Sequence, residues 1–255
     1  MISILSYNVN GIRAAERKGF FNWLAEESPD ILCIQETKAQ KEQLDETFTA
    51  PEGYHTFWYS AEKKGYSSVA IFSKLKPNHV EYGCGIPVYD KEGRILRADY
   101  DKFSIISAYF PSGTSGDIRQ KFKEAFLDDM FDYISDLKKE IPNLIISGDY
   151  NICHRPIDIH DPVRNKKSSG FLPQERQWIS KLIDSGFVDT FRKFNQDPDH
   201  YSWWSYRAGA RAKNKGWRID YQMVAKSIAE NCVGAEILPE VIHSDHCPIK
   251  ILMDF

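Results

Sequence analysis

Short apolar runs rich in β-branched residues recur along the chain, and they constrain its fold more than any other feature. Runs of roughly four to eight such residues are typical of β-strands. We predict strands at residues 2–7, 30–35, 54–59, 67–73, 95–100, 103–109, 143–147, 219–224 and 249–253. The runs 95–100 and 103–109 are so close in sequence that they require a hairpin, which a purely parallel sheet does not contain.

Two amphipathic helices are predicted between these runs. The first, residues 117–139, spaces its apolar residues by three or four and ends on lysines that suit the negative end of a helix dipole. Its predicted buried residues are Ile118, Phe122, Phe126, Met130, Ile134 and Leu137. The second begins at Pro173, stops at Gly186 and is predicted to bury Trp178, Ile179, Leu182 and Ile183. This pattern predicts an α/β fold, a mixed-sheet sandwich with outer helices.

Composition supports one domain spanning residues 1–255. The chain is 42% hydrophobic, with no internal repeat and no linker between regions of different composition. No apolar run approaches the roughly 20 residues of a membrane span, and the Met1 end lacks signal-peptide features, so we expect a cytoplasmic protein without membrane contact. Five scattered cysteines, each expected to be a small buried hydrophobe, argue against a disulfide framework or a zinc site.

Polar residues follow four of the predicted strands where each strand ends. They are Asn8, Glu36, Tyr109 and the pair Asp149 and Asn151. If these strands share a direction, one edge of the sheet collects amides, carboxylates and a phenol, a donor set that suits a hard cation such as Mg²⁺. Taken alone, the Glu36 motif favours a solvated helix-capping residue, and Asp149 is equally explained as a turn former; the pattern shared by the four strands favours a site instead.

Two residues near the C-terminus form a predicted pair. His246 lies just before the last strand, and Asp220 interrupts an otherwise apolar strand, where a carboxylate needs a partner. An Asp220–His246 pair would orient the imidazole and raise its affinity for a proton. Such a group can stabilise a phosphate oxyanion or transfer a proton.

The stretch from residue 201 to residue 218 interleaves aromatic and basic side chains. This pattern predicts a nucleic-acid surface, on which cations meet phosphates and aromatic rings stack. The alternative is a core strand pair followed by a solvated basic loop. The overall net charge of −3 means that binding of a polyanion must come from such local patches. The predicted DNA-contacting residues are Trp203, Trp217, Arg207, Arg211 and Lys213, with Arg164, Lys166 and Lys167 as a second basic segment or a merely solvated one.

Seven sequence motifs together resemble the exodeoxyribonuclease III and AP endonuclease family. They are LSYNVNGIRA (5–14), IQETK (34–38), AYFPSG (108–113), GDYN (148–151), GFLPQERQW (170–178), WRIDY (217–221) and SDHCP (244–248). They appear in the family's order and span almost the whole chain. The resemblance implies a DNase I-like four-layer α/β-sandwich, two packed mixed sheets flanked by helices. It also implies Mg²⁺-dependent cleavage of DNA 5′ to abasic sites, with 3′–5′ exonuclease and 3′-end-processing activity.

The resemblance also implies roles for individual residues. Glu36 corresponds to the principal metal ligand, with Asn8, Asn10 and Asp245 beside the metal. The catalytic residues implied are Asp149, which orients or deprotonates water, Asn151, Tyr109, and His246 supported by Asp220. Trp203, Trp217 and Ile219 match the pocket for an extruded abasic sugar. The implied partner is double-stranded DNA with abasic sites or blocked 3′ ends, bound by a monomer, with Mn²⁺ as a second candidate metal.

The chain departs from parts of the family pattern at two positions. Asn10 stands where some members carry an acidic residue, which leaves open whether the site binds one metal ion or two. Ser112 stands where others carry Asn or Gln, which leaves the balance of endonuclease and exonuclease activity open. The chain starts at its first strand, as expected of a bacterial-type enzyme. Two alternatives are a phosphoesterase of the same fold acting on inositol phosphates or sphingomyelin, and a non-catalytic DNA-binding module.

Overall fold

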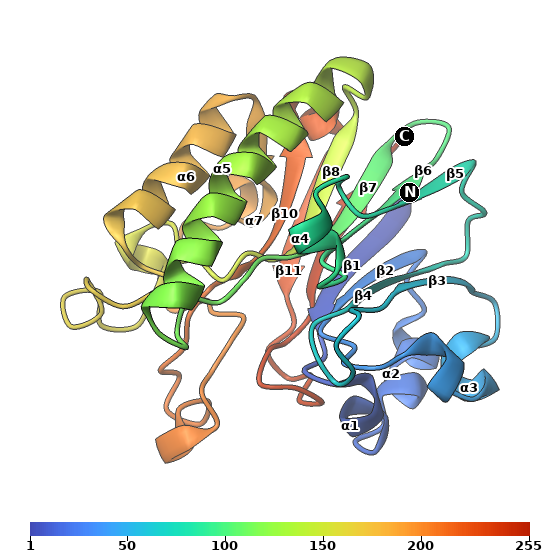
Figure 1. Ribbon diagram of the computed structural model, residues 1–255, viewed down its shortest axis with the longest axis horizontal. Helices are drawn as coiled ribbons and strands as arrows, with labels where there is room; N and C mark the ends of the chain where they lie inside the picture. Colours follow the sequence, from blue (N-terminus) through green and yellow to red (C-terminus); the bar gives the residue numbers. More distant parts are fainter.

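Two six-stranded sheets pack face to face in the computed structural model, which describes residues 1–255 (Figure 1). The first sheet has the order β11-β12-β1-β2-β4-β3, and the second has the order β5-β6-β7-β8-β10-β9. The strands of the first sheet are β1 (Ile2–Asn8), β2 (Ile31–Gln35), β3 (His55–Tyr59), β4 (Val69–Ser73), β11 (Cys232–Ile237) and β12 (Ile249–Met253). Those of the second are β5 (His79–Tyr82), β6 (Ile95–Asp99), β7 (Ser104–Tyr109), β8 (Leu144–Asp149), β9 (Phe187–Asp189) and β10 (Asp220–Ala225).

Each sheet contains one central parallel pair. Strands β1 and β2 are parallel in the first sheet, and β7 and β8 are parallel in the second. All other neighbours are antiparallel, including the predicted β6–β7 hairpin. Both sheets are therefore mixed, as predicted.

Helices cover the outer face of each sheet, which completes the predicted four layers. In Figure 1, α5 and α6 lie over the second sheet, while α1 and α2 lie by the first. The helices are α1 (Ile12–Glu16), α2 (Phe20–Glu27), α3 (Glu46–Thr49), α4 (Pro87–Asp90), α5 (Asp117–Glu140), α6 (Pro173–Asp184) and α7 (Thr190–Phe194). Short 3₁₀ turns span Lys41–Gln43, Pro156–Asp158, Arg207–Gly209 and Lys226–Asn231. No helix is both long enough and apolar enough to cross a membrane.

Three apolar layers hold the sandwich together. Between the sheets, Ile4 and Ile71 of the first sheet share a cluster with Ile105, Ile145 and Val224 of the second. A second cluster joins α5 and α6 to the outer face of the second sheet, and a third joins α1 and α2 to the first. Because burial of apolar surface is the main stabilising contribution to folding, strands that are apolar on both faces select this layered arrangement.

The structure corrects three sequence expectations. Strands β5, β9 and β11 were not predicted, because each is short or lies at a sheet edge with polar, exposed residues in place of a continuous apolar run. Ile118 is 85% exposed, because the first turn of α5 precedes the helix's first buried residue, Lys123. All five cysteines are free thiols, and Cys84 is only partly buried, whereas the other four are buried as expected.

Candidate active site

The carboxyl ends of the two parallel strand pairs meet at one edge of the sandwich. Asn8 ends β1, Glu36 follows β2, and Tyr109 and Asp149 end β7 and β8. The Nδ2 atom of Asn8 donates to Glu36 Oε1 at 2.8 Å and to Asp149 Oδ2 at 2.8 Å. One buried amide thus joins the carboxylates of two different sheets, so the predicted polar strand ends do converge.

Three site residues adopt a left-handed backbone conformation within two residues of the end of a strand. Asn10, Glu36 and Asn151 have φ angles of 47°, 52° and 52°. This region is uncommon for residues other than glycine, and such residues are frequent at functional sites. At Asn151 the turn lets the backbone N–H donate to Asp149 Oδ1 at 2.8 Å, while Nδ2 donates to Asp149 Oδ2 at 3.2 Å.

Asp220 and His246 form the predicted pair. The Nδ1 atom of His246 lies 2.9 Å from Asp220 Oδ2, and both side chains are buried. Burial alone would lower the pKa of His246, but the Asp220 carboxylate, helped by Asp149 and Asp245, outweighs burial and raises that pKa. The ring is therefore a cation at neutral pH, with Nδ1–H donating to Asp220 and Nε2 located 3.9 Å from Asp149 Oδ2.

The Asp149 carboxylate and the Tyr109 phenol occupy environments that raise their pKa values. Burial raises the pKa of Asp149, the Asp220 and Glu36 carboxylates reinforce the effect, and the His246 cation opposes it. Burial and the Glu36 charge also raise the pKa of Tyr109 well above its usual range. Asp149 is thus suited to take up a proton, and Tyr109 remains a hydrogen-bond donor.

Glu36, Asp149 and His246 form one cluster that could hold a metal ion, with candidate ligand atoms within 4.8 Å of one another. A protonated imidazole has no lone pair for a metal, so the oxygens of Glu36 and Asp149 are the ligands that fit a hard cation. Glu36 Oε2 also lies 2.9 Å from Lys38 Nζ, an ammonium that already balances negative charge there.

The other residues predicted beside the metal make contacts with the protein. Asn8 Oδ1 accepts from the Asn10 backbone N–H at 3.0 Å, and Asn10 Oδ1 accepts from Lys38 Nζ. The Asp245 carboxylate accepts from Asn10 Nδ2 at 2.9 Å and from Trp203 Nε1 at 3.0 Å. Asp245 therefore links the segment that follows β1 to Trp203, and it lies outside the three-residue cluster.

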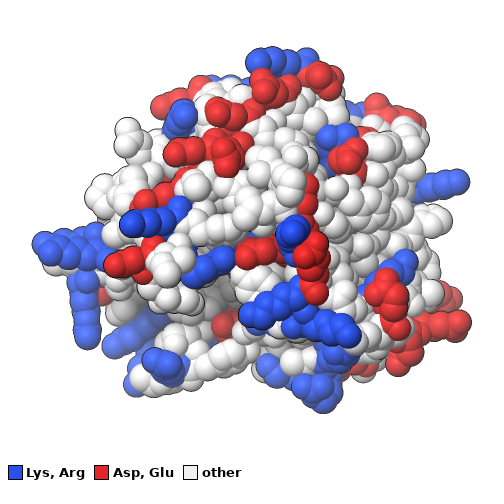
Figure 2. Space-filling model, in the orientation of Figure 1, with Lys and Arg blue, Asp and Glu red and all other residues white.

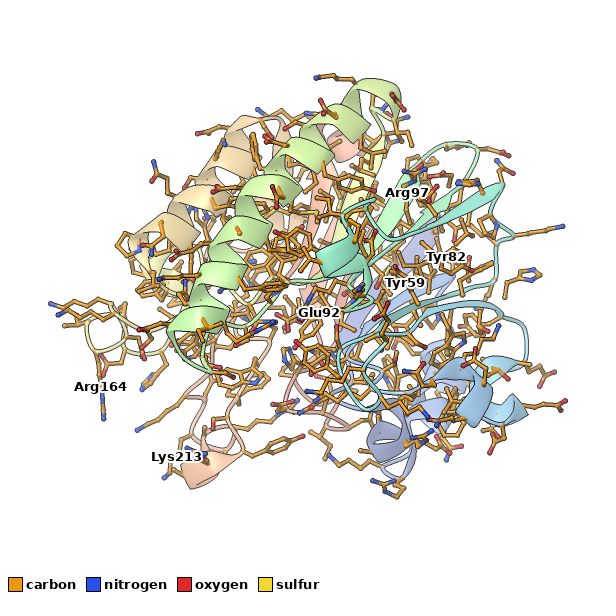
Figure 3. All side chains as sticks on the ribbon, in the orientation of Figure 1. Tyr59, Tyr82, Glu92, Arg97, Arg164 and Lys213 are labelled. Atoms are coloured by element: carbon orange, nitrogen blue, oxygen red, sulfur yellow. The ribbon has the colours of Figure 1, made fainter.

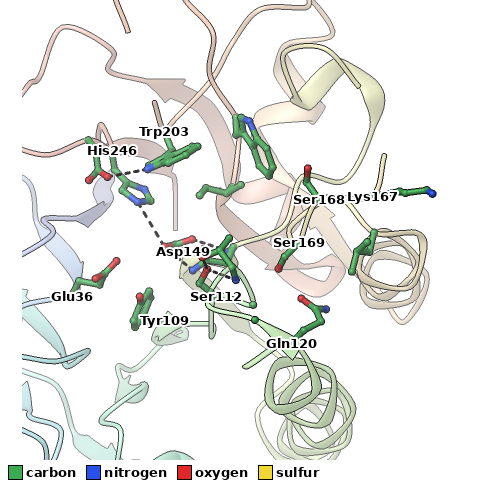
Figure 4. Close-up of a pocket in the computed structure, with 18 of the residues that line it drawn as sticks. Glu36, Tyr109, Ser112, Gln120, Asp149, Lys167, Ser168, Ser169, Trp203 and His246 are labelled. Carbon is green, nitrogen blue, oxygen red and sulfur yellow. Dashed lines mark hydrogen bonds and ion pairs between the residues drawn. The ribbon is translucent and has the colours of Figure 1, made fainter. Parts of the chain in front are cut away.

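A cavity of about 750 Å³ opens from this cluster (Figure 4). Trp203, Trp217 and Ile219 form an apolar side, with the two indole rings edge to face at 5.9 Å. The cavity's polar lining residues include Ser112, Thr114, Gln120, Lys167, Ser168 and Ser169. The cavity thus presents an apolar face, a polar face and a charged end to one bound molecule.

Two basic loops project from the edge of the molecule at which the cavity opens. Arg164, Lys166 and Lys167 lie on one, and Arg207 and Lys213 lie on the other, all exposed. Figure 3 shows Arg164 and Lys213 at the tips of these loops, and Figure 2 shows Lys and Arg side chains gathered along this edge. Arg211 differs from these cations, because its guanidinium donates to backbone carbonyls of residues 239–244.

Sequence reasoning did not assign three charged groups near the site. Lys38 contacts Glu36, and the guanidinium of Arg94 lies 4.8 Å from the Tyr109 ring and donates to its backbone carbonyl. Lys123, fully buried, pairs with Glu175 at 2.6 Å and donates to the Asn151 carbonyl at 2.8 Å. Lys123 occupies a position on the apolar face of α5, and this lysine among apolar residues was the signal that could have predicted a buried acidic partner.

A model of the Endonuclease/Exonuclease/phosphatase family matches residues 5–246. The chain belongs to this family. An exodeoxyribonuclease of Bacillus subtilis is 42% identical over 259 residues, covering 99% of this chain and 100% of that protein. A DNA-(apurinic or apyrimidinic site) endonuclease of Dictyostelium discoideum is 37% identical over 260 residues, covering 99% of this chain and 71% of that protein.

The solved structures agree with these sequence comparisons. An AP endonuclease from Archaeoglobus fulgidus is 30% identical, has a TM-score of 0.90 and matches over 100% of both chains. The resemblance to exodeoxyribonuclease III and AP endonucleases, and the DNase I-like fold that it implied, are thereby confirmed.

Proposed function

We propose that the protein is a DNA-repair hydrolase that cleaves DNA 5′ to abasic sites and also removes nucleotides and blocking groups from 3′ ends. The observation that carries the proposal is the cavity that joins the Glu36–Asp149–His246 cluster to the Trp203–Trp217–Ile219 wall. Its exodeoxyribonuclease and AP endonuclease relatives support the same activity. The substrate is double-stranded DNA with abasic sites or blocked 3′ ends, bound by a monomer in the cytoplasm.

The chemistry follows from the positions of the polar groups. Hydrolysis of a phosphodiester requires a positioned water, a base for its proton and compensation of charge on the phosphate oxygens. Asp149, with its raised pKa, takes the proton of the water that Asn151 helps to hold. The free Nε2–H of the His246 cation donates to a phosphate oxygen, and the Tyr109 phenol donates near the same phosphate.

The proposed metal is Mg²⁺, with Mn²⁺ as a substitute, held principally by Glu36 in the Glu36–Asp149–His246 cluster. When bound, it supplies a positive charge that neutralises the phosphate and helps to ionise the attacking water. Asn8 keeps the two carboxylates in place by donating to both.

The selectivity for abasic sites follows from the aromatic wall. A sugar that lacks its base loses little stacking energy when it leaves the helix, and it fits against Trp203, Trp217 and Ile219. A nucleotide with its base would be excluded by bulk. The exposed cations on the two loops supply the phosphate contacts that hold the duplex.

The test uses an end-labelled duplex with one tetrahydrofuran abasic analogue, beside an intact duplex, each with Mg²⁺ or with EDTA. We expect one Mg²⁺-dependent cut 5′ to the lesion. Glu36→Gln and Asp149→Asn should each lower the rate by about 1000-fold or more, because each removes a charge at the reacting centre. Glu26→Gln, an exposed carboxylate on α2, is the matched control and should cut at the wild-type rate.

Other outcomes would replace the proposal. Progressive shortening of both duplexes from the 3′ end would make exonuclease activity primary. Hydrolysis of inositol phosphates or sphingomyelin without DNA cleavage would indicate a different phosphoesterase. Equal affinity for abasic and intact duplex without turnover would indicate a binding module.

A further inference from the structure

Arg211 is bound to backbone carbonyls, although it lies on the basic loop that faces the cavity's edge. Its Nη1 atom donates to Ser244 O at 2.9 Å, and its Nη2 atom donates to Pro239 O at 2.8 Å and Val241 O at 2.7 Å. The guanidinium carbon also lies 4.6 Å from the Trp204 ring. The Nη1 and Nη2 atoms are thus bonded inside the protein, which leaves the guanidinium poorly placed to bind a phosphate.

The segment that Arg211 holds carries the site's histidine. Residues 238–248 connect β11 to β12 without regular helix or strand, and they include Asp245 and His246. No other group donates to the carbonyls of Pro239, Val241 and Ser244. Irregular backbone has no ladder of hydrogen bonds of its own, so bonds from side chains restrain the segment: three come from Arg211, and Lys18 Nζ donates one more to His243 O at 2.9 Å.

The same loop bonds to this segment at its other end. The Trp204 backbone N–H donates to Asp245 O at 3.0 Å, and Trp203 forms a bridge with His246. Two other cations of the loop, Arg207 and Lys213, are exposed and lie a few residues from Arg211. The loop therefore has two kinds of basic residue, those that face solvent and one that is bonded to the His246 segment.

We propose that Arg211 is a positioning residue for the nuclease reaction, which ties the DNA-facing loop to the segment that holds His246. The proposal rests on the proposed nuclease function. Arg207 and Lys213 contact the DNA backbone, and Arg211 keeps the loop that bears them in a fixed relation to the imidazole that meets the scissile phosphate. Its role differs from the DNA contact that the sequence predicted for it.

Arg211→Lys distinguishes a positioning role from a direct contact with DNA, because it keeps the positive charge and removes the planar guanidinium. We expect kcat at saturating abasic duplex to fall by about 10- to 100-fold, as for a small misplacement of a reacting group. The Kd for the duplex, measured by fluorescence anisotropy in EDTA, should stay within about twofold, with an unchanged salt dependence, because the charge is conserved. Lys213→Ala should instead raise Kd and reduce the salt slope by about one.

Arg192→Lys is the matched structural control. Arg192 is also buried and donates to the backbone carbonyls of Asn195 and Asp197, and it pairs with Asp158 at 2.7 Å, but it lies outside the cavity lining. This variant should lower Tm without the loss of kcat. A fall in kcat for Arg211→Lys that matches the fall for Arg192→Lys at equal loss of Tm would overturn the proposal, as would a raised Kd with normal kcat.

Two further measurements keep the proposal testable. In Arg211→Ala, added guanidinium should restore kcat above a sodium chloride control of equal ionic strength, because it can fill the slot over Trp204; no rescue counts against the proposal. The NMR signals of the His246 ring should shift in Arg211→Lys and not in Arg192→Lys, which requires no catalysis. If wild-type protein cuts no DNA, the proposed function fails, while these ring signals still decide whether Arg211 positions His246.

Discussion

At the scale of single residues, the site depends on a buried histidine whose charge is set by its neighbours. Asp220 lies directly opposite Asp149 in the β8–β10 register, so the two carboxylates are on adjacent strands, with His246 in contact with one and near the other. The imidazolium separates two like charges in a buried place, which explains why all three groups tolerate burial together.

Asp220→Asn should lower the single-turnover rate on an abasic duplex by about 100-fold, the lower end of what proton transfer by a positioned group contributes. An amide does not stabilise the imidazolium, so the ring loses the charge that faces the phosphate. Asp136→Asn, which replaces an exposed carboxylate on α5, is the control and should react like wild type. A rate for Asp220→Asn that equals the control would show that His246 does not need its partner.

The sequence allowed prediction of those site residues that interrupt or follow apolar runs. Glu36, Asp149 and Asp220 stand out because a carboxylate beside a buried strand requires a partner. Arg211 carries no such signal, because its partners, the carbonyls of Pro239, Val241 and Ser244, lie about 30 residues away and are backbone atoms. Only the folded chain shows which carbonyl a cation meets.

At the scale of secondary structure, the site is the meeting point of two β–α–β units. Parallel neighbours require a crossover, and here α1 and α2 connect β1 to β2, while α5 connects β7 to β8. Each unit brings two carboxyl ends to the same edge of its sheet. Central strands were predictable because they are continuous apolar runs, whereas β5, β9 and β11 lack that pattern and are defined by pairing with neighbours.

Gly148→Ala should destabilise the β7–β8 pair at the point where it presents Tyr109 and Asp149. A Cβ at Gly148 would lie 1.9 Å from the Ala108 carbonyl oxygen, so the two strands must separate. We expect the free energy of unfolding in urea to fall by about 3 kcal/mol, at the upper end of overpacking costs. Gly234→Ala on β11, where a Cβ meets Leu252 at an ordinary 3.6 Å, is the control. Equal stability of the two variants would contradict this account of the strand pair.

At the scale of the whole molecule, both sheets depend on one shared core and one shared site. The inter-sheet cluster takes residues from both sheets, and the Asn8 amide joins their catalytic ends. We therefore propose that residues 1–255 unfold as a single domain. The basic edge, by contrast, could not be read from the overall charge of −3, because its two loops are far apart in sequence and meet only in the fold.

A buried ion network behind the cavity wall should make this single unit sensitive to acid. Asp158 Oδ1 lies 2.7 Å from both Arg192 Nη2 and Arg218 Nε, and Arg218 follows Trp217 of the wall. Burial alone would raise the pKa of Asp158, but the two guanidiniums outweigh it and lower that pKa to about 2. The carboxylate therefore stabilises the fold fully above its unfolded-state pKa of about 4, by about 2 kcal/mol, and this contribution is lost as pH falls from about 4 towards 2.

The measurement is the free energy of unfolding in urea between about pH 6 and pH 3, followed by tryptophan fluorescence and by circular dichroism. Asp158→Asn cannot titrate, so its stability should fall less steeply with pH than that of the wild type, by about 1 kcal/mol over this range. Asp136→Asn, at an exposed position, should keep the wild-type slope. If Asp158→Asn and wild type show parallel curves, acid acts through other carboxylates. Coincident transitions by the two probes would support one cooperative domain, because Trp23 and Trp58 report on the first sheet and Trp178 on the second.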